Sequence, residues 1–267
     1  MSPCAWTDLF PQADYRFNFQ FKRGLLDDFY RPSQLDSSGL IDRSRLLSEN
    51  RSECLTYLPD AAESIAEAHQ LFVDLKLVPS PLVADPEQSL LTLGRALEAD
   101  IILLRIKEDR PTIIGGVVCF PTGWRLPDKL GRHLLDIHDV VPQLNAELGT
   151  RMHRFLEGLK PGVSWERANW GLSASAQLNL NPILGYPRLT QDTRIEEIYM
   201  RVESQSLTVL PIGESILFGI RIHLTPLTRL WSDPDLRQRI QRSLQTMPPR
   251  VADYKGLNPI LAMLTSG

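Results

Sequence analysis

The sequence predicts an α+β protein in which helices flank an antiparallel sheet. Runs of β-branched and apolar residues follow one another in the middle of the chain, and several have no helical segment between them, which favours antiparallel pairing. Segments with helical periodicity lie mainly before and after these runs. The chain has 267 residues, of which 43% are apolar, so it can bury a core without disulfides or a structural metal.

We expect the whole chain, 1–267, to form one domain with three parts. A mostly helical lead-in covers 1–98, the sheet core covers 99–225, and C-terminal helices cover 226–267. No internal repeat or low-complexity linker separates these parts.

The lead-in is expected to contain one short strand and then helices. The strand is predicted because three aromatic residues alternate along the chain. These residues are Phe17, Phe19 and Phe21. Residues 41–80 are typical of two helices, the second opened by a capping box in which Glu63 follows Asp60 by three residues. Pro79 and Pro81 end that helix.

The core is expected to begin with a hairpin. Its strands are Ile101–Ile106 and Ile113–Phe120, because the polar residues between them form a turn. Later strands are predicted at Arg167–Leu172, Ile195–Val202 and Ser215–His223. Apolar residues at helical spacing predict helices over 144–159 and over Thr228–Met247, the latter interrupted near its start by Pro234.

Composition excludes several classes of partner. A net charge of -3 and a pI near 6.0 provide no basic field for nucleic acid. Cys4, Cys54 and Cys119 are far apart and lack a CxxC spacing, which disfavours a disulfide framework, a structural zinc site and an iron–sulfur cluster. The sequence has no signal peptide and no run of about 20 apolar residues, so we expect a cytoplasmic protein without a membrane anchor.

Common catalytic motifs are missing, which leaves isolated candidates. The sequence has no P-loop, no GxGxxG after a strand, no GxSxG and no HExxH. His138 is followed by Asp139 and the apolar, stiff residues before Pro142, so its imidazole could ligate haem iron while Asp136 or Asp139 orients the other ring nitrogen. The more common alternative is a histidine that fills or caps a turn.

Two charged residues stand on predicted strands in apolar surroundings. Glu203 and Arg221 would be costly to bury alone, so they should pair, face a cavity, or both; an ordinary cross-strand ion pair is the alternative to a functional role. Other candidates favour plain structural roles: Cys119 as a small core residue, the tryptophans Trp124, Trp165 and Trp170 as core rather than cofactor cover, and His69, His133 and His153 as surface or helix-flank residues.

Five strings in order resemble one known family, the haem-dependent oxidative N-demethylases. The resemblance spans most of the chain, and no single string is diagnostic. The strings are an RLL helix at 45–47, which agrees more weakly, GVVCFPTGWRLPDKLGR at 116–132, IHDVVP at 137–142, RANW at 167–170 and RVESQSLTVLPIGESILFGIR at 201–221.

This resemblance implies a PAS-like antiparallel core that carries one haem b. It also implies a monooxygenase reaction, in which a small secondary amine such as dimethylamine, O2 and two electrons give the primary amine and formaldehyde. The electrons would come from NAD(P)H through flavin and iron–sulfur reductase subunits, because this chain has no iron–sulfur cysteine pattern.

The resemblance also assigns roles to residues. His138 would be the proximal haem ligand. Glu203 and Arg221 would be distal residues that position substrate or bound oxygen, with Glu203 able to take a proton from an alkylammonium of pKa near ~10.4. Further cavity and propionate contacts are expected from four residues. These are Asn169 and Trp170, lining the same cavity, and Arg125 and Lys129, meeting the propionates.

The chain departs from the family pattern at three positions. Ser204 replaces an arginine, which would remove a cation close to Glu203; His223 replaces an aromatic residue; and Val140 replaces a proline after His138. His223 and Arg221 should share one face of their strand. These departures put activity on dimethylamine itself in doubt.

Two other functions fit the same sequence. A haem-binding PAS-like sensor would bind haem without turning over amines, and would therefore release no formaldehyde. A haem-free interaction protein would show no Soret band.

Overall fold

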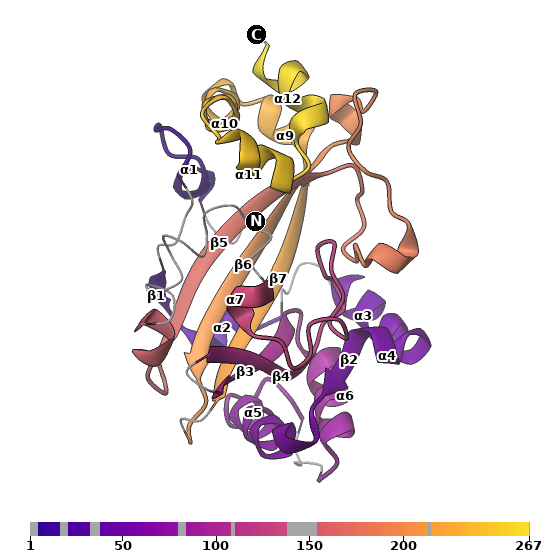
Figure 1. Ribbon diagram of the computed structural model, residues 1–267, viewed down its shortest axis with the longest axis vertical. Coiled ribbons are helices and arrows are strands. Elements are labelled where there is room, and N and C mark those ends of the chain that lie inside the picture. The colour runs from indigo at the N-terminus through magenta and orange to yellow at the C-terminus, as the bar shows by residue number, and fades with distance from the viewer. Residues whose placement is uncertain are drawn as a thin grey trace.

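A computed structural model describes residues 5–16, 21–32, 38–79, 84–107, 110–137, 154–212 and 215–266. Within these ranges, seven antiparallel strands form one sheet in the order β1-β5-β6-β7-β3-β4-β2 (Figure 1). The strands are β1 (Lys22–Gly24), β2 (Leu55–Tyr57), β3 (Asp100–Lys107), β4 (Arg110–Val117), β5 (Ser164–Ser173), β6 (Tyr199–Val209) and β7 (Ser215–Pro226). The five long strands, β3 to β7, form the predicted PAS-like core, with its first and last strands side by side at the centre.

Helices precede and follow this core, as an α+β fold requires. The α-helices before the core are α1 (Trp6–Leu9), α2 (Leu26–Tyr30), α3 (Ser38–Glu49), α4 (Arg51–Cys54), α5 (Ala62–Asp74) and α6 (Pro86–Ala96). Inside and after it lie α7 (Leu134–Ile137), α9 (Leu227–Trp231), α10 (Pro234–Gln245), α11 (Pro249–Tyr254) and α12 (Asn258–Thr265). Short 3-10 turns are η1 (Pro59–Ala61), η2 (Pro182–Leu184) and η3 (Ile195–Glu197).

The two faces of the sheet carry different residues, because successive side chains in a strand point to opposite sides. The register aligns Asn169, Glu203 and Ile222 on one side, which we call the Glu203 face. It aligns Ser204 with Arg221 on the other side, which we call the Arg221 face. Glu203 and Arg221 therefore lie on opposite faces.

Helices cover the Arg221 face in two groups. α2 to α6 pack on β3, β4 and β7, where Ile101, Leu103 and Leu217 are buried. α1 and α9 to α12 pack on β5 and β6 around Trp170 and Met200. Figure 1 shows the C-terminal helices gathered at one end of the long strands, away from α3 to α6.

The Glu203 face is covered by loop segments and a short stretch of helix. Leu207, Ile216 and Ile220 on the strands pack against Leu126 and Leu156. Residues 154–157 are helical and belong to the predicted helix over 144–159, the rest of which lies mostly outside the described residues. Leu134 of α7, close to the last described residue before this gap, also packs against the core of this face.

Most predicted elements are confirmed. The hairpin forms between β3 and β4, strands form at two of the three later positions, and Pro234 separates α9 from α10 by beginning the second helix. The predicted strand at Ile195–Val202 is wrong at its start, since η3 occupies its first three residues and β6 begins at Tyr199. The aromatic strand at Phe17–Phe21 falls largely outside the described residues; β1 begins at Lys22.

The helix predicted to start at Asp60 is present, but its capping box is wrong. Pro59 opens a 3-10 turn, so α5 starts at Ala62 and Asp60 does not cap it. The Asp60 carboxylate instead accepts a hydrogen bond from Lys107 Nζ at 2.7 Å. α6 was not among the predicted elements, although its N-cap Asp85 and Pro86 are typical helix-start residues.

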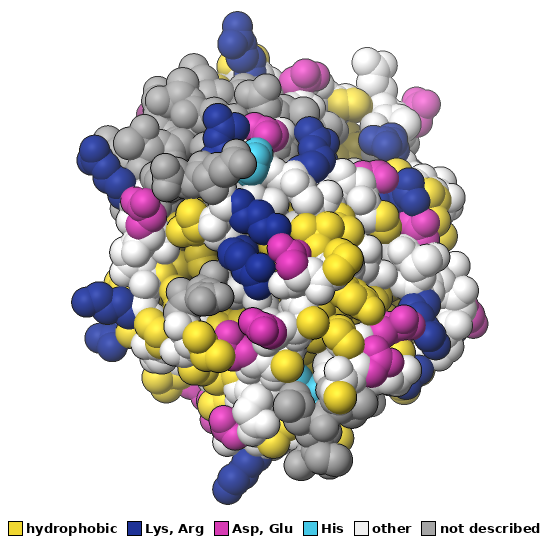
Figure 2. Space-filling view, turned by 60° about the horizontal axis from the view of Figure 1, so that its bottom comes forward, with side chains coloured by type: hydrophobic (Ala, Val, Ile, Leu, Met, Phe, Trp, Pro, Cys, Tyr) yellow, Lys and Arg dark blue, Asp and Glu magenta, His cyan; other side chains and the backbone are white. Residues whose placement is uncertain are grey.

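The surface mixes charges of both signs. On the face shown in Figure 2, Lys and Arg side chains are interspersed with Asp and Glu, and hydrophobic side chains reach the surface between them. Among the described residues, no helix combines the length and apolar character needed to cross a bilayer.

Candidate functional site

A polar network on the Glu203 face is centred on Glu203 itself. Thr122 Oγ1 donates to Glu203 Oε1 at 2.6 Å, and Gln205 Nε2 donates to Glu203 Oε2 at 3.3 Å. Arg201 Nε in turn donates to Thr122 Oγ1 at 2.9 Å. Both carboxylate oxygens are therefore held by neighbouring groups, which fixes the direction in which the carboxylate points.

Two further cations approach this network from β5 and from the C-terminal helices. Arg167 Nε donates to Gln205 Oε1 at 2.7 Å, and burial lowers the Arg167 pKa to about 10, partly opposed by Glu203. Lys255, at the end of α11, donates to Asn169 Oδ1 at 3.3 Å, and Asn169 lies directly opposite Glu203. Burial likewise lowers the pKa of Lys255 to about 8. The carboxylate is thus close to several positive charges.

An open groove of about 400 Å³ lies on the same face. Its walls are largely aromatic: the Phe21 and Phe155 rings stack at 4.4 Å, and Phe155 meets the Trp165 ring edge-on at 5.9 Å. Arg154, Gly158 and Leu159 complete the lining.

Phe21 joins the groove to the polar network. Its ring lines the groove, and the Arg167 guanidinium lies over the same ring at 5.2 Å from the centroid. Trp165 and Arg167 are also two residues apart on β5, so both point to the Glu203 face. The groove and the network are therefore neighbouring parts of one surface.

Arg221 does not pair with Glu203, so the predicted alternative of an ion pair between them is wrong. The strand register puts them on opposite faces, where Arg221 instead pairs with Glu98 and donates to the Phe29 carbonyl oxygen at 3.1 Å. Arg221 and Glu203 cannot line one cavity on a single face of the sheet.

The departures at 204 and 223 also lie on the Arg221 face. Ser204 is buried and points away from Glu203, so its substitution for arginine does not remove a cation from the Glu203 carboxylate. His223 shares its face with Arg221, as predicted. Burial, reinforced by the positive charge of Arg221, lowers the His223 pKa to about 4.

Asn169 and Trp170 do not share a cavity, contrary to the prediction, because they are consecutive residues of a strand. Asn169 is exposed on the Glu203 face. Trp170 is buried on the other face and packs on Phe10 at 4.9 Å between ring centroids. Lys255 reaches both residues around the edge of β5, because its Nζ donates to the Trp170 carbonyl oxygen at 2.5 Å.

The two predicted propionate contacts, Arg125 and Lys129, lie in the loop between β4 and α7. Arg125 donates to both carboxylate oxygens of Glu53, at 2.9 and 2.7 Å, and pairs with Asp128 at 3.3 Å. Lys129 lies in the turn that follows, where its backbone N–H donates to Leu126. The Arg125 side chain therefore binds α4, which lies at the β2 edge of the sheet.

His138, Val140 and His153 lie outside the described residues. α7 ends at Ile137, immediately before His138, and Leu134 of α7 packs against the core of the Glu203 face. Of the described histidines, His133 bonds to Thr112 at 2.8 Å. His69 is fully buried, so its predicted surface position is wrong; α5 turns it into the core with Ile65 and Phe72.

Most of the network around Glu203 was not predicted from the sequence. A signal was present, because polar residues alternate along β6 at 201, 203 and 205, which predicts one polar face. Nothing in the local sequence marks Lys255 or Thr122, which reach the network from distant parts of the chain.

Comparison with known proteins adds one match. The family model described as haem-dependent oxidative N-demethylase, alpha subunit-like, matches residues 73–264. The matched region includes all five long strands, the residues around Glu203 and the segment containing His138. The chain therefore belongs to the haem-dependent oxidative N-demethylase, alpha subunit-like, family.

Proposed function

We propose that this chain binds haem b at the Glu203 face and is the catalytic subunit that removes a methyl group from a small secondary amine. The observation that carries the proposal is the contact between the aromatic groove and the Glu203 network through Phe21. A flat, apolar wall suits a planar cofactor, and oriented polar groups beside it suit a small polar substrate.

The residues of the groove fit a flat, largely apolar cofactor with acidic side chains. Its volume of about 400 Å³ lies within the roughly 300–1,000 Å³ common for cofactor sites. Phe21, Phe155 and Trp165 would contact the macrocycle, and the exposed Arg154 would meet a propionate. His138, which directly follows α7, is the axial ligand we propose.

When bound, haem would supply O2 activation, with electrons from NAD(P)H through separate flavin and iron–sulfur reductase subunits. The "alpha subunit-like" family description is consistent with such partners. Glu203 would bind the amine nitrogen, and Thr122 and Gln205 would hold the carboxylate in position. Because Arg167, Arg201 and Lys255 carry positive charge near Glu203, the site disfavours an alkylammonium and favours the neutral amine.

The first test is the absorption spectrum of protein expressed with a haem precursor. Wild type should show a Soret band that is lost or strongly shifted in His138→Ala. An unchanged band in the variant would show that another residue is the axial ligand. The absence of a band in wild type would indicate a haem-free interaction protein.

The second test is turnover with dimethylamine, NAD(P)H and the reductase components, read as formaldehyde release. Glu203→Gln keeps the shape but removes the charge, so kcat/KM should fall by roughly ten- to a thousand-fold, equal to about 1.4–4 kcal/mol of transition-state stabilisation. Glu196→Gln, at an exposed glutamate of η3, is the matched control and should behave as wild type. Haem binding without formaldehyde release from any small amine would indicate a haem sensor instead.

A further inference from the structure

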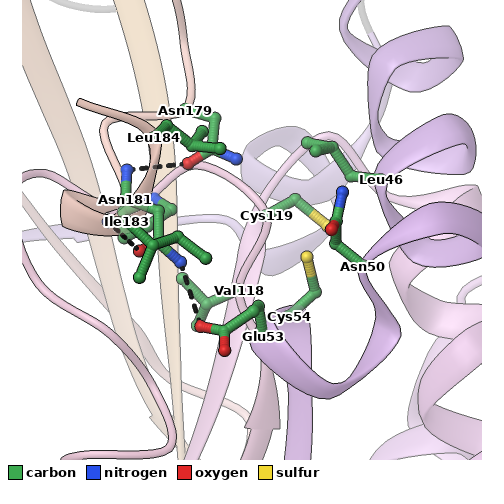
Figure 3. A pocket seen from close by; sticks show the side chains of 11 residues that line it. Leu46, Asn50, Glu53, Cys54, Val118, Cys119, Asn179, Asn181, Ile183 and Leu184 are labelled. Carbon is green, nitrogen blue, oxygen red and sulfur yellow. Dashed lines mark hydrogen bonds between the residues drawn. The ribbon is translucent and has the colours of Figure 1, made fainter. Parts of the chain in front are cut away.

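Two cysteines that are distant in the sequence meet at the β2 edge of the sheet. Cys54 ends α4, and Cys119 follows β4. The Val118 N–H donates to the Cys54 carbonyl oxygen at 2.7 Å, which holds the two segments together. Figure 3 shows the sulfur atoms of the two cysteines pointing toward each other, and each thiol affects the pKa of the other.

A buried cation accompanies this pair. Arg43 is fully buried and donates to Asp100 Oδ1 at 2.6 Å and to the Gly94 carbonyl oxygen at 2.8 Å. Its Nη2 has no hydrogen-bond partner among the described residues. The guanidinium is close enough to Cys119 to interact electrostatically with it. Asp100 already balances the Arg43 charge, and a negative charge on Cys119 would add a second interaction with a guanidinium that still has an unused donor.

The backbone around Cys119 is also fixed. Asp100, which binds Arg43, accepts hydrogen bonds from the backbone N–H groups of Cys119 at 2.7 Å and Phe120 at 3.0 Å. Hydrogen bonding with Cys54 and the Arg43 charge lower the Cys119 pKa, against the effects of burial and of the negative charge on Asp100. The same hydrogen bond and burial raise the Cys54 pKa. The two thiols are thus unequal, and Cys119 is the more acidic of the two.

Both cysteines line a pocket of about 10 Å³, roughly the space of one water molecule, although the cysteines themselves are almost fully buried. Polar side chains form much of its lining, with Asn50 beside Cys119 and Asn179 and Asn181 on the opposite wall (Figure 3). So small an opening excludes a protein disulfide as the oxidant and leaves only molecules little larger than water.

We propose that Cys54 and Cys119 form a redox-active dithiol that hydrogen peroxide oxidises to a disulfide. The Cys119 thiolate attacks one peroxide oxygen, the O–O bond breaks, and with one proton the products are a Cys119 sulfenic acid and water. The Cys54 sulfur then attacks the Cys119 sulfur, the S–O bond breaks, and a second water leaves as the S–S bond forms. The two thiols have then lost two electrons and two protons, and one hydrogen peroxide has become two waters.

The test uses the full chain with Cys4→Ala, so that only this pair can react. Stepwise hydrogen peroxide under native conditions should remove two hydrogen atoms from the intact mass and yield a Cys54–Cys119 cross-linked peptide, both reversed by dithiothreitol. If the cross-link appears only after denaturation, the proposal is wrong.

Single-cysteine variants in the same background test which sulfur reacts first. With Cys54→Ser, a sulfenic-acid probe such as dimedone should label Cys119; with Cys119→Ser, labelling of Cys54 should be at least about ten-fold slower. Circular dichroism checks that both variants are folded. Equal and slow labelling of the two cysteines would contradict the proposed activation of Cys119 by Arg43. None of these readouts depends on haem or on amine turnover.

Discussion

At the scale of single residues, side chains alternate between the two faces of a strand, and this alternation decides which groups can act together. Glu203 and Ser204 are neighbours in sequence, yet Glu203 contacts Thr122 on one face while Ser204 faces Arg221 on the other. A substitution at 204 therefore acts on Arg221 and its partner Glu98 rather than on the Glu203 carboxylate. The same alternation puts Asn169 beside Lys255 on one face, whereas Trp170 lies in the core on the other face.

His223→Phe should make the chain less sensitive to acid. The folded-state pKa of His223 is lowered to about 4 from 6.5, so below pH 6.5 the unfolded chain takes up a proton that the folded chain does not. Stability is therefore complete above pH 6.5 and is lost as the pH falls toward 4. Phenylalanine cannot take up this proton, so relative to wild type the variant should gain about 1–2 kcal/mol in unfolding free energy between pH 8 and pH 5.

Urea denaturation of both proteins at the two pH values measures this difference. The comparison of pH values cancels any gain or loss that phenylalanine causes by packing alone. A difference between the two proteins that stays constant with pH would show that His223 does not titrate with a lowered pKa.

The sequence could predict only part of the candidate site. Glu203 was identifiable because a carboxylate on an apolar strand needs a partner, and its neighbours at 201 and 205 follow from period-two alternation. The partner of Arg221 was not identifiable, because Glu98 lies far from it in sequence and the meeting depends on β3 pairing with β7. Lys255 was missed for the same reason: its contact with Asn169 requires α11 to fold back over the edge of β5.

At the scale of elements, local sequence patterns predicted the hairpin, but they could not predict which strands distant in sequence pair with each other. β3 and β4 were predictable because two apolar runs flank a short polar turn. β2 was missed because its three residues carry no alternation pattern, and it is a strand only through its pairing with β4. The central position of β7 beside β3 depends on contacts across half of the chain, which no local pattern encodes.

Close approach of β3 and β4 requires a glycine at 116. A Cβ at this position would lie 2.3 Å from the Ile101 carbonyl oxygen and 3.1 Å from Ile102 Cα, both backbone atoms. Gly116→Ala must therefore move one strand, and we expect a loss of at least about 1–3 kcal/mol in unfolding free energy. Gly171, in β5 of the same sheet, is the matched control, because a Cβ there would have no other atom within 4 Å among the described residues.

Urea denaturation of Gly116→Ala and Gly171→Ala tests this expectation. Gly171→Ala should be neutral or slightly stabilising, by up to about 0.5–1 kcal/mol, because alanine restricts the unfolded chain more than glycine does. Equal effects at the two positions would mean that the gap between β3 and β4 is not what limits residue size at 116.

At the scale of the whole molecule, the two sheet faces have different kinds of cover. Two groups of helices bury the Arg221 face in continuous apolar cores. The Glu203 face is covered by a smaller core, and beyond it lie the aromatic groove and the polar network. In the part of the chain that the structure describes, the functional groups of the Glu203 face stand on a sheet whose other face is packed by helices, which is the support that a preorganised binding site requires.

If haem occupies the groove, it should stabilise the whole fold. A ligand that binds only the folded chain adds about 2.7 kcal/mol at a concentration of 100 times Kd. Since 1 kcal/mol shifts Tm by about 2–4 °C in a chain of this size, haemin should raise Tm by about 5–10 °C.

Trp165→Leu removes a wall of the groove and should reduce this shift, whereas Trp231→Leu, which alters packing on the C-terminal helices, should retain it. Thermal unfolding followed by circular dichroism measures all three proteins with and without haemin. Equal shifts in the two variants would place haem away from the groove, and no shift in wild type would contradict haem binding by the folded chain.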